Sequence, residues 1–312
     1  MTALRRSTDP ARPALADPAA GVAFIEGAYV PITEAKISIL DFGFTRSDVT
    51  YDVVHVWNGR FFRLDRHLER FQNSMRTLRM SLPYGKDDIR RILSECVKRT
   101  GLKNAFVAMV CTRGRPEPGS RDPRTCTNQF IAYAIPFVWI ADLERQEKGL
   151  QAIISARPRI PALSVDPTVK NYHWLDMVMS LFEAYDKGAE IPILLDLDGN
   201  VAEGPGFNAF CVRDGKVLTP DQGMLEGITR RTMLDLCKGA GLALEVRKVS
   251  VQEFRDADEI FLSSTAGGVI PIVTLDRRIY GNGVPGPVTM QLRKLYWAKH
   301  DQGWEGTPID YD

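Results

Sequence analysis

The sequence predicts an α+β fold arranged as two domains. Segments typical of strands and of helices follow one another irregularly, without the strict strand–helix–strand order of a parallel α/β protein. With 312 residues the chain is long enough to bury two cores, and a polar, charged stretch separates its two halves. These observations predict a loose amino-terminal arm over 1–20, a small α+β domain over 21–137, a linker over 138–149 and a larger domain over 150–312.

The composition is that of an ordinary globular protein and excludes several kinds of partner. A quarter of the residues are charged and 44% are apolar, with 40 basic against 39 acidic side chains. No run of like charge stands out, so nucleic acid and membrane surfaces are not expected as partners. No apolar run approaches membrane-spanning length, and the arm lacks the apolar centre of a signal peptide. We therefore expect a soluble, cytoplasmic protein.

The cysteines are five in number and show no close pairing along the chain. An odd, scattered set is typical of reduced, partly buried thiols and argues against a disulfide framework or a zinc site. The five residues are Cys96, Cys111, Cys126, Cys211 and Cys237.

The first half is predicted to begin with strands. One strand over 21–30 turns at Glu26-Gly27, and a second covers 36–40. The strongest local signal is a hairpin, because β-rich runs over 49–57 and 60–63 flank the pair Asn58-Gly59. Asn-Gly supplies the two positive φ angles of a tight type I′ turn.

Two amphipathic helices and two further strands complete the small domain. Asp65 is expected to cap a helix that has its apolar residues on one face, and a second helix over 86–100 ends at Gly101. Strands over 104–113 and 129–137 enclose a loop over 114–127, and a loop of that length is often functional. The apolar face of the first helix is formed by Leu68, Phe71, Met75 and Leu78.

The second half mixes shorter strands with helices. Asp-Gly pairs at 198–199 and 214–215 predict tight turns. The predicted strands are 150–156, 191–197, 207–213, 216–218, 242–249 and 259–263, and the predicted helices are 173–187, 229–240, 251–255 and 288–299.

A single lysine, Lys170, stands between a turn-forming Asp-Pro pair and the start of a helix. In such a place a lysine can be desolvated, which lowers its pKa and frees the amine to attack a carbonyl. On this stretch alone an ordinary surface lysine is the alternative.

Two later segments have the character of anion-binding sites. Gly227-Ile-Thr-Arg230 opens a helix, whose free N–H groups and positive dipole end suit a phosphate. Residues 263–268 end a strand with small and hydroxyl-bearing side chains whose backbone N–H groups can also hold an anion. An ordinary helix start and a plain flexible turn remain the alternatives.

Two anion-binding segments and a nucleophilic lysine together suggest a cofactor that carries both a phosphate and a carbonyl. Pyridoxal 5′-phosphate fits, and it also needs an acid beside its pyridine nitrogen. Glu203 follows a strand and is flanked by glycines that would let a ring approach. By itself Glu203 could equally be an acid in a surface loop.

In this order and spacing, Val-Lys170-Asn, Glu203-Gly-x-Gly-x-Asn, Gly-Ile-Thr-Arg and Ser-Thr-Ala resemble the fold type IV pyridoxal-phosphate enzymes. That group includes branched-chain and D-amino-acid aminotransferases and aminodeoxychorismate lyase, and the likeness runs from about Phe24 to Trp297. It makes 150–312 the cofactor-binding domain and Lys170 the Schiff-base lysine and proton shuttle. It implies that the remaining cofactor contacts are Arg70, Ile228, Thr229, Thr265 and Ala266 at the phosphate and Glu203 at the pyridine nitrogen.

Within this group the run over 47–57, together with Asp-Pro-Thr-Val-Lys-Asn-x-x-Trp174, is most similar to the (R)-selective amine transaminases. The likeness implies a substrate pocket and, in a mobile loop, an arginine that neutralises the carboxylate of a keto acid. Two positions differ from several such enzymes, an arginine replacing His and an alanine replacing Glu, and either change could admit a carboxylate more readily. His55 could instead be satisfied by its neighbours, and Trp174 could be plain core. The implied substrate-binding residues are Arg46, Tyr51, His55, Phe106, Ala108, Arg121 and Trp174.

The resemblance implies ping-pong transamination between an (R)-amine and a keto acid such as pyruvate. It also implies a homodimer with its active sites at the interface. A D-amino-acid or branched-chain amino-acid aminotransferase, or a lyase of the same fold, would use the same cofactor residues. A cofactor-binding protein without turnover is the alternative from another class.

Overall fold

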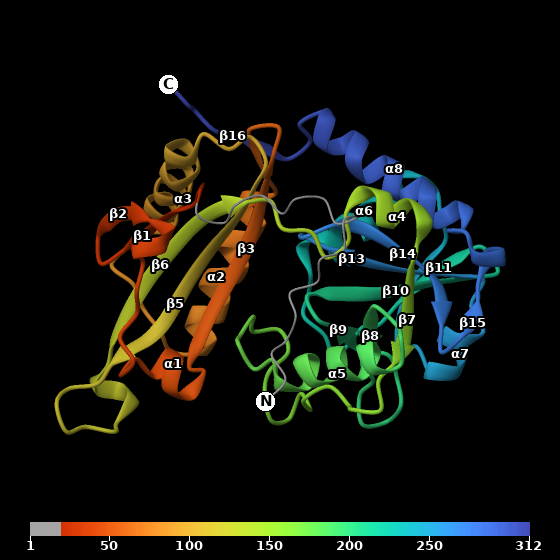
Figure 1. Ribbon diagram of the computed structural model, residues 1–312, viewed down its shortest axis with the longest axis horizontal. Helices are drawn as coiled ribbons and strands as arrows, with labels where there is room; N and C mark the ends of the chain where they lie inside the picture. The colour runs from red at the N-terminus through yellow and green to blue at the C-terminus, as the bar shows by residue number, and fades with distance from the viewer. Residues whose placement is uncertain (1–19) are drawn as a thin grey trace, which may run out of the picture.

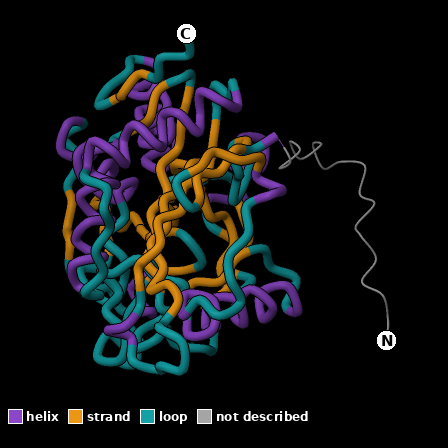
Figure 2. Tube along the Cα trace, turned by 90° about the vertical axis from the view of Figure 1, so that its left-hand side faces the viewer, coloured by secondary structure: helices purple, strands orange, loops and turns teal. Residues whose placement is uncertain are grey.

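The computed structural model describes residues 20–312, so all but the last residue of the predicted arm lies outside the described part. Two β-sheets stand side by side with helices packed on them (Figure 1). In a view turned by 90°, strands run through the middle of the molecule and most helices lie on the outside (Figure 2). These mixed helices and sheets confirm the predicted α+β class.

The first sheet is antiparallel throughout, in the strand order β16-β4-β3-β5-β6-β1-β2. Helices α2 and α3 pack on it around a core that contains Phe61, Phe71 and Leu93. The strands are β1 (Val22–Ile25), β2 (Ala28–Pro31), β3 (Val49–Trp57), β4 (Arg60–Phe62), β5 (Ala105–Arg115), β6 (Thr127–Pro136) and β16 (Gly306–Pro308). The helices are α1 (Phe42–Arg46), α2 (Leu64–Thr77) and α3 (Lys86–Thr100), with 3₁₀ turns at Ile32–Glu34 and Pro123–Thr125.

The second sheet is mixed, in the order β12-β11-β10-β13-β14-β7-β8, with β9 paired to β10 and β15 paired to β14. β7 runs parallel to both of its neighbours, and β11 runs parallel to β12. The strands are β7 (Leu150–Ile154), β8 (Ile191–Ile193), β9 (Glu203–Gly204), β10 (Phe207–Arg213), β11 (Lys216–Thr219), β12 (Leu244–Val246), β13 (Glu259–Ser264), β14 (Gly268–Leu275) and β15 (Arg278–Ile279). The helices are α4 (Leu143–Lys148), α5 (Leu175–Asp186), α6 (Ile228–Gly239), α7 (Val251–Arg255) and α8 (Pro287–Asp301), with a 3₁₀ turn at Gly281–Gly283.

The turns that the sequence predicted most strongly are confirmed. Asn58 and Gly59 join β3 to β4 with φ angles of 49° and 73°, as a type I′ turn requires. Gly101 ends α3 in the left-handed conformation, at φ 69°. Asp214 and Gly215 make the corresponding turn between β10 and β11.

Several local predictions were wrong. Residues 36–40 form no strand. Asp65 does not cap α2, which begins after Arg63; it lies in the first turn of the helix and pairs with Lys86 and Arg90. An acid there still favours the helix, because the first turn carries the positive end of the helix dipole.

The carboxyl-terminal tail returns to the first sheet. β16 pairs with β4, and Ile309 is buried in the first core with Tyr311 packed against it. The tail therefore contributes to the sheet built mainly by the first half of the chain. Among residues 20–312, no helix is both long enough and apolar enough to cross a membrane, and all five cysteines are unpaired.

Candidate active site

A cavity of about 430 Å³ lies where the two sheets face each other. Its walls come from β3 and β5 on one side and, on the other, from the loop before α5, from β9 and β10, from the start of α6 and from the end of β13. The wall residues used below are Tyr51, Phe106, Lys170, Trp174, Glu203, Gly227, Thr229, Ser263 and Thr265.

β3 supplies both the cavity wall and its support because side chains alternate between the two faces of a strand. Tyr51 and Val53 line the cavity, whereas Val54 and Val56 belong to the core under α2 and α3. Asp52 also faces α2, where it pairs with two helix side chains. One strand therefore connects the cavity with the packing of the first sheet.

Lys170 is held against β3 by its own backbone. Its carbonyl accepts hydrogen bonds from the Tyr51 N–H (3.1 Å) and from the Thr50 hydroxyl (2.8 Å), so the loop before α5 is joined to the first sheet. The Nζ atom lies 4.4 Å from the centre of the Tyr51 ring. Burial, followed by the positive charge of Arg70, lowers the pKa of Lys170 to about 8. A much larger share of the amine is therefore neutral near pH 7 than in an exposed lysine.

Glu203, on β9, has both carboxylate oxygens engaged inside the cavity. Oε1 accepts from Arg159 Nε (3.0 Å) and Oε2 accepts from the Leu225 N–H (3.0 Å). Burial raises the pKa of the Glu203 carboxyl, and Arg159 opposes that rise. The other side of the Arg159 guanidinium donates to Asp176 (2.7 Å), which also accepts from the Ile160 N–H. The carboxylate is therefore oriented by a network reaching from β9 to α5.

Arg159 was missed in the sequence analysis. It follows β7 in the run Arg157-Pro-Arg159, where nothing local distinguishes a buried arginine from a solvated one. Its burial follows from two acids, Asp176 and Glu203, that come from other elements.

The two predicted anion-binding segments lie next to each other. They are residues 227–230, at the start of α6, and residues 263–268, which run from the end of β13 to the start of β14. The hydroxyls of Thr229 and Thr265 are 3.5 Å apart, and both residues line the cavity with Ala266 and Ile228. Gly227 allows close packing here, because a Cβ at this position would lie 2.0 Å from Oδ1 of Asn208.

Arg70 closes this end of the cavity. Its Nε and one terminal nitrogen donate to Asp52 at 2.7 and 2.8 Å, and the other terminal nitrogen donates to the Glu226 carbonyl. Asp52 is fully buried, yet Arg70 and His67 hold its pKa well below the ordinary value despite the opposing effect of burial. A charged guanidinium is therefore fixed beside the two anion-binding segments.

These residues fit a cofactor that carries an aldehyde, a basic ring nitrogen and a phosphate. The cavity contains a buried amine and an oriented carboxylate, and it is also lined by a helix start, hydroxyls and an arginine. The Ser263 hydroxyl, at the cavity wall, is buried and has no hydrogen-bond partner among residues 20–312. An additional acceptor such as a phosphate oxygen would satisfy it.

The predicted substrate residues divide into two groups. Tyr51, Phe106 and Trp174 line the cavity. Ala108 lies on the same face of β5 as Phe106 and belongs to the apolar cluster that contains Tyr51. His55 is on the cavity-facing side of β3 but is buried against α8 instead of lining the cavity.

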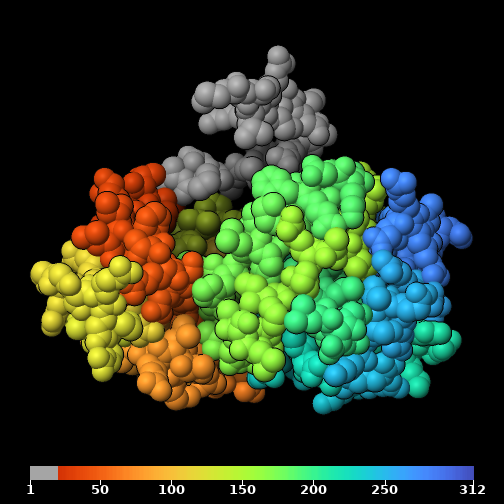
Figure 3. All heavy atoms as spheres, turned by 90° about the horizontal axis from the view of Figure 1, so that it is seen from below, coloured from red at the N-terminus to blue at the C-terminus, as the bar shows by residue number. Residues whose placement is uncertain are grey.

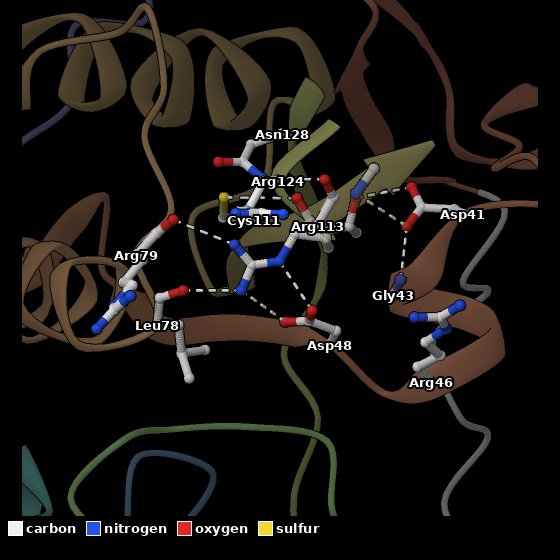
Figure 4. A network of polar contacts seen from close by, with 12 residues as sticks. Asp41, Gly43, Arg46, Asp48, Leu78, Arg79, Cys111, Arg113, Arg124 and Asn128 are labelled. Carbon is white, nitrogen blue, oxygen red and sulfur yellow. Dashed lines mark hydrogen bonds and ion pairs between the residues drawn. The ribbon is translucent and has the colours of Figure 1, made fainter. Parts of the chain in front are cut away.

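Arg46 and Arg121 lie apart from this chain's own cavity. The guanidinium of Arg46 stacks 3.5 Å from the ring of Phe42 and donates to the Arg121 carbonyl. Close by, Arg113 binds Asp48 and the carbonyls of Leu78 and Arg79 (Figure 4). The β5–β6 connection, which carries Arg121, projects at one edge of the molecule, away from the second sheet (Figures 1 and 3).

Comparison with known proteins identifies the family. A model described as amino-transferase class IV matches residues 50–275. The chain therefore belongs to the class IV aminotransferases, of fold type IV, and is a pyridoxal-phosphate-dependent aminotransferase.

Relatives and solved structures agree with this family. A branched-chain-amino-acid aminotransferase of Pseudomonas aeruginosa is 32% identical over 240 residues, 76% of this chain and 77% of that one. A D-alanine aminotransferase of Bacillus licheniformis is 29% identical over 269 residues, 86% and 93% of the two chains. The crystal structure of the branched-chain amino acid aminotransferase of Thermobaculum terrenum in its PLP form is 28% identical, with a TM-score of 0.83 over 93% of this chain and 98% of that one.

Proposed function

We propose that the enzyme transfers an amino group between an (R)-amine and a keto acid such as pyruvate by a ping-pong mechanism, with Lys170 as the lysine that bonds the cofactor. One observation carries the choice of substrate. Within the described residues, each arginine lining the cavity is already held by a carboxylate: Arg70 by Asp52, Arg145 by Glu190 and Arg159 by Glu203. A cavity with aromatic walls, in which every arginine already has a carboxylate partner, favours a donor that has no carboxylate.

Bound pyridoxal 5′-phosphate supplies an aldehyde for the amino group and a ring that accepts the electrons released at the substrate carbon. Lys170, with its lowered pKa, takes up the proton from that carbon and later returns it. Tyr51 packs against the amine and limits its contact with water.

Glu203 holds a proton at the pyridine nitrogen, and Arg159 orients it for that role. Arg70, the hydroxyls of Thr229 and Thr265 and the backbone at Ile228 and Ala266 bind the phosphate. Because these groups come from both sheets, phosphate binding would stabilise the arrangement in which Lys170 and Glu203 face the same space.

The substrate side is the less specific part of the proposal. Tyr51, Phe106 and Trp174 offer aromatic surface for an arylalkyl or alkyl amine. A D-amino-acid or branched-chain amino-acid aminotransferase is the second candidate, favoured by the similarity to a branched-chain-amino-acid aminotransferase and a D-alanine aminotransferase. Either of these would need a cation for the carboxylate of its amino donor.

The keto acid of the proposed reaction also carries a carboxylate. In a homodimer, the partner subunit would supply a cation for it. We propose that the projecting β5–β6 connection of one subunit, with Arg121, reaches the cavity of the other. Large apolar side chains exposed on α5 and near α1 support a subunit contact. They are Ile39, Leu40, Phe44, Leu175, Met179, Phe182 and Tyr185.

Two experiments test the proposal. Borohydride reduction of the loaded enzyme, followed by peptide mapping, should leave the cofactor on the peptide that contains Lys170; label on another lysine would refute the site. Initial rates should be higher for (R)-1-phenylethylamine with pyruvate than for its (S) form or L-leucine with pyruvate, and higher than for D-alanine with a keto acid other than pyruvate. Preference for either amino acid would instead establish the second candidate.

A further inference from the structure

A buried pair of histidines joins the two sheets immediately behind the anion-binding segments. His55 of β3 and His300 of α8 are 2% and 6% exposed, and their Nε2 atoms are 2.8 Å apart. The ring of Phe62 stacks on that of His300 at 3.9 Å, which restricts the pair to this orientation. None of these three residues lines the cavity, so direct contact with substrate does not explain the pair.

The hydrogen bonds define which nitrogen of each imidazole carries a proton. His300 Nδ1 lies 2.8 Å from the Tyr296 carbonyl, which can only accept, so this nitrogen is the donor. Burial lowers the pKa of both rings, to about 4 for His300, so the pair is neutral near pH 7. His300 Nε2 is then an acceptor, and His55 Nε2 must donate to it.

Nδ1 of His55 faces the second anion-binding segment. The Thr265 backbone is close enough to oppose the lowering of the pKa of His55 by burial, yet Nδ1 completes no hydrogen bond within residues 20–312. Buried polar atoms are normally satisfied, so one left open at this position requires an explanation. The backbone of residues 263–268 is the part of the fold that it faces.

Tyr296, one helical turn before His300, contacts both anion-binding segments. A Cβ on Gly268 would lie 2.6 Å from the Tyr296 ring, so the ring is packed directly against the end of residues 263–268. Its hydroxyl lies beside Thr229, which opposes the rise in the pKa of Tyr296 caused by burial, although the hydroxyl completes no hydrogen bond among the described residues. Tyr296 is completely buried, so a shift of α8 would displace both segments that pack against it.

We propose that Tyr296, His55 and His300 are positioning residues that hold the two anion-binding segments at the separation that binds the cofactor's phosphate. The inference rests on the proposed phosphate contacts of Thr229 and Thr265. It reassigns His55 from the substrate pocket to a layer behind the phosphate. Hydrogen bonds to a charged group depend strongly on donor placement, so small shifts of either segment would weaken phosphate binding.

The test compares two ligands that differ only in the phosphate. The full-length enzyme is stripped of cofactor, and the Kd values for pyridoxal 5′-phosphate and for pyridoxal are measured by fluorescence titration. Tyr296→Phe and His55→Phe each retain an aromatic ring and remove polar atoms only from this layer or its histidine pair. In each variant we expect the Kd for pyridoxal 5′-phosphate to rise roughly tenfold, about the contribution of one hydrogen bond, while the Kd for pyridoxal stays unchanged.

A matched control is Tyr280→Phe, because Tyr280 is also buried and donates its hydroxyl to a backbone carbonyl, that of Arg255, away from the cavity. This variant should have a lower Tm and an unchanged ratio of the two Kd values. Phosphorus NMR of the bound cofactor should move in Tyr296→Phe and not in Tyr280→Phe.

The outcomes separate this inference from the proposed function. If Tyr296→Phe and His55→Phe fold and keep the wild-type ratio, the positioning role is wrong. If both ligands bind more weakly by the same factor and Tm is lower, the residues have a purely structural role and the positioning role is also wrong. If the wild-type enzyme itself does not prefer the phosphorylated ligand, the proposed phosphate site fails first. Should His55→Phe not fold, Tyr296→Phe, which removes one oxygen, decides the question.

Discussion

At the scale of single residues, the chemistry depends on charges that are buried beside one another. Lys170 loses solvation and lies near the guanidinium of Arg70, and both effects favour its neutral form. Burial raises the pKa of Glu203, and Arg159 and the Leu225 N–H oppose that rise. Both groups are therefore shifted towards their neutral forms, and in the proposed mechanism one accepts a proton while the other faces the pyridine nitrogen.

The lowered pKa of Lys170 predicts a pH-dependent stability in the cofactor-free enzyme. The pKa is about 8 in the folded chain and 10.5 in the unfolded chain, so the unfolded chain binds more protons between these values. The free energy of unfolding should therefore rise with pH across this window, by up to about 3 kcal/mol for this group. Urea unfolding at pH 7 to 10.5 should show this rise in the difference between the wild type and Lys170→Met, because the buried cysteines with raised pKa values titrate in the same range in both proteins.

Lys187→Met is the control for that series, because Lys187 is half exposed at the end of α5 and pairs with Glu183. Its pH dependence should match that of the wild type. The same rise in Lys170→Met as in the wild type would show that another group is responsible.

Removing the guanidinium of Arg159 should impair catalysis more than folding. Arg159→Met leaves Glu203 with only the Leu225 N–H, so burial would keep its carboxyl protonated and unable to hold a proton at the ring. We expect kcat to fall roughly 100-fold, with a smaller change in KM. Steady-state kinetics on the loaded variant measures both.

Arg113→Met is a matched control, since Arg113 is also mostly buried and paired with a carboxylate, that of Asp48, away from the cavity (Figure 4). It should lower Tm and leave kcat within about twofold, as expected for a residue that touches no reacting group. If the two variants lose kcat equally, the effect reflects general destabilisation.

At the scale of elements, the site is assembled where strands end and helices begin. β3 holds the backbone of Lys170, and the start of α6 lies next to the end of β13 in the cavity wall. Helix starts and strand ends present backbone N–H groups that regular structure leaves free. These elements can therefore bind an anion through backbone N–H groups, without a buried lysine.

The start of α6 should tolerate no side chain at Gly227. In Gly227→Ala the new Cβ would lie 2.0 Å from Oδ1 of Asn208, whose side-chain N–H group donates to the Leu225 carbonyl. Moving Asn208 would displace the helix start, so we expect affinity for pyridoxal 5′-phosphate to fall about tenfold and stability to fall by about 1–3 kcal/mol.

Gly239→Ala, at the other end of the same helix, is the control, because a Cβ there meets nothing within 4 Å. It should be neutral or stabilise the protein by a few tenths of a kcal/mol. Cofactor titration and thermal unfolding of both variants test the contrast, and equal affinities would contradict it.

At the scale of the whole molecule, the exposed apolar residues of α5 and of the segment near α1 require an explanation. Leu175 and Phe182 are 79% and 57% exposed, and Ile39 is 74% exposed. Clustered side chains of this kind are typical of a subunit interface. The proposed homodimer would bury them and bring a second chain to the cavity.

Placing charges on α5 should separate the subunits. Leu175→Glu combined with Phe182→Glu would bury two carboxylates in the contact, so we expect a monomer by light scattering and loss of most activity. Leu197→Glu is the control, because Leu197 is 68% exposed outside this cluster and should leave the mass unchanged. A monomeric wild-type enzyme with full activity would refute the proposed interface.

Local signals predicted much of the fold because they depend on neighbouring residues. The Asn58-Gly59 turn and the end of α3 at Gly101 both follow from backbone conformations that few residues adopt. The prediction of a strand over 36–40 was wrong, because a strand also needs a partner strand. The apolar residues of this segment remain exposed, and no strand pairs with them.

By itself, the sequence determined the α+β class and the family, and it singled out the lysine that we propose bonds the cofactor, because these follow from short motifs in a fixed order. Only the tertiary structure decided that Arg159 supports Glu203, that His55 faces α8 rather than the substrate space, and that the tail completes the first sheet. Each of these depends on a partner far away in the chain, and no local pattern carries the position of such a partner.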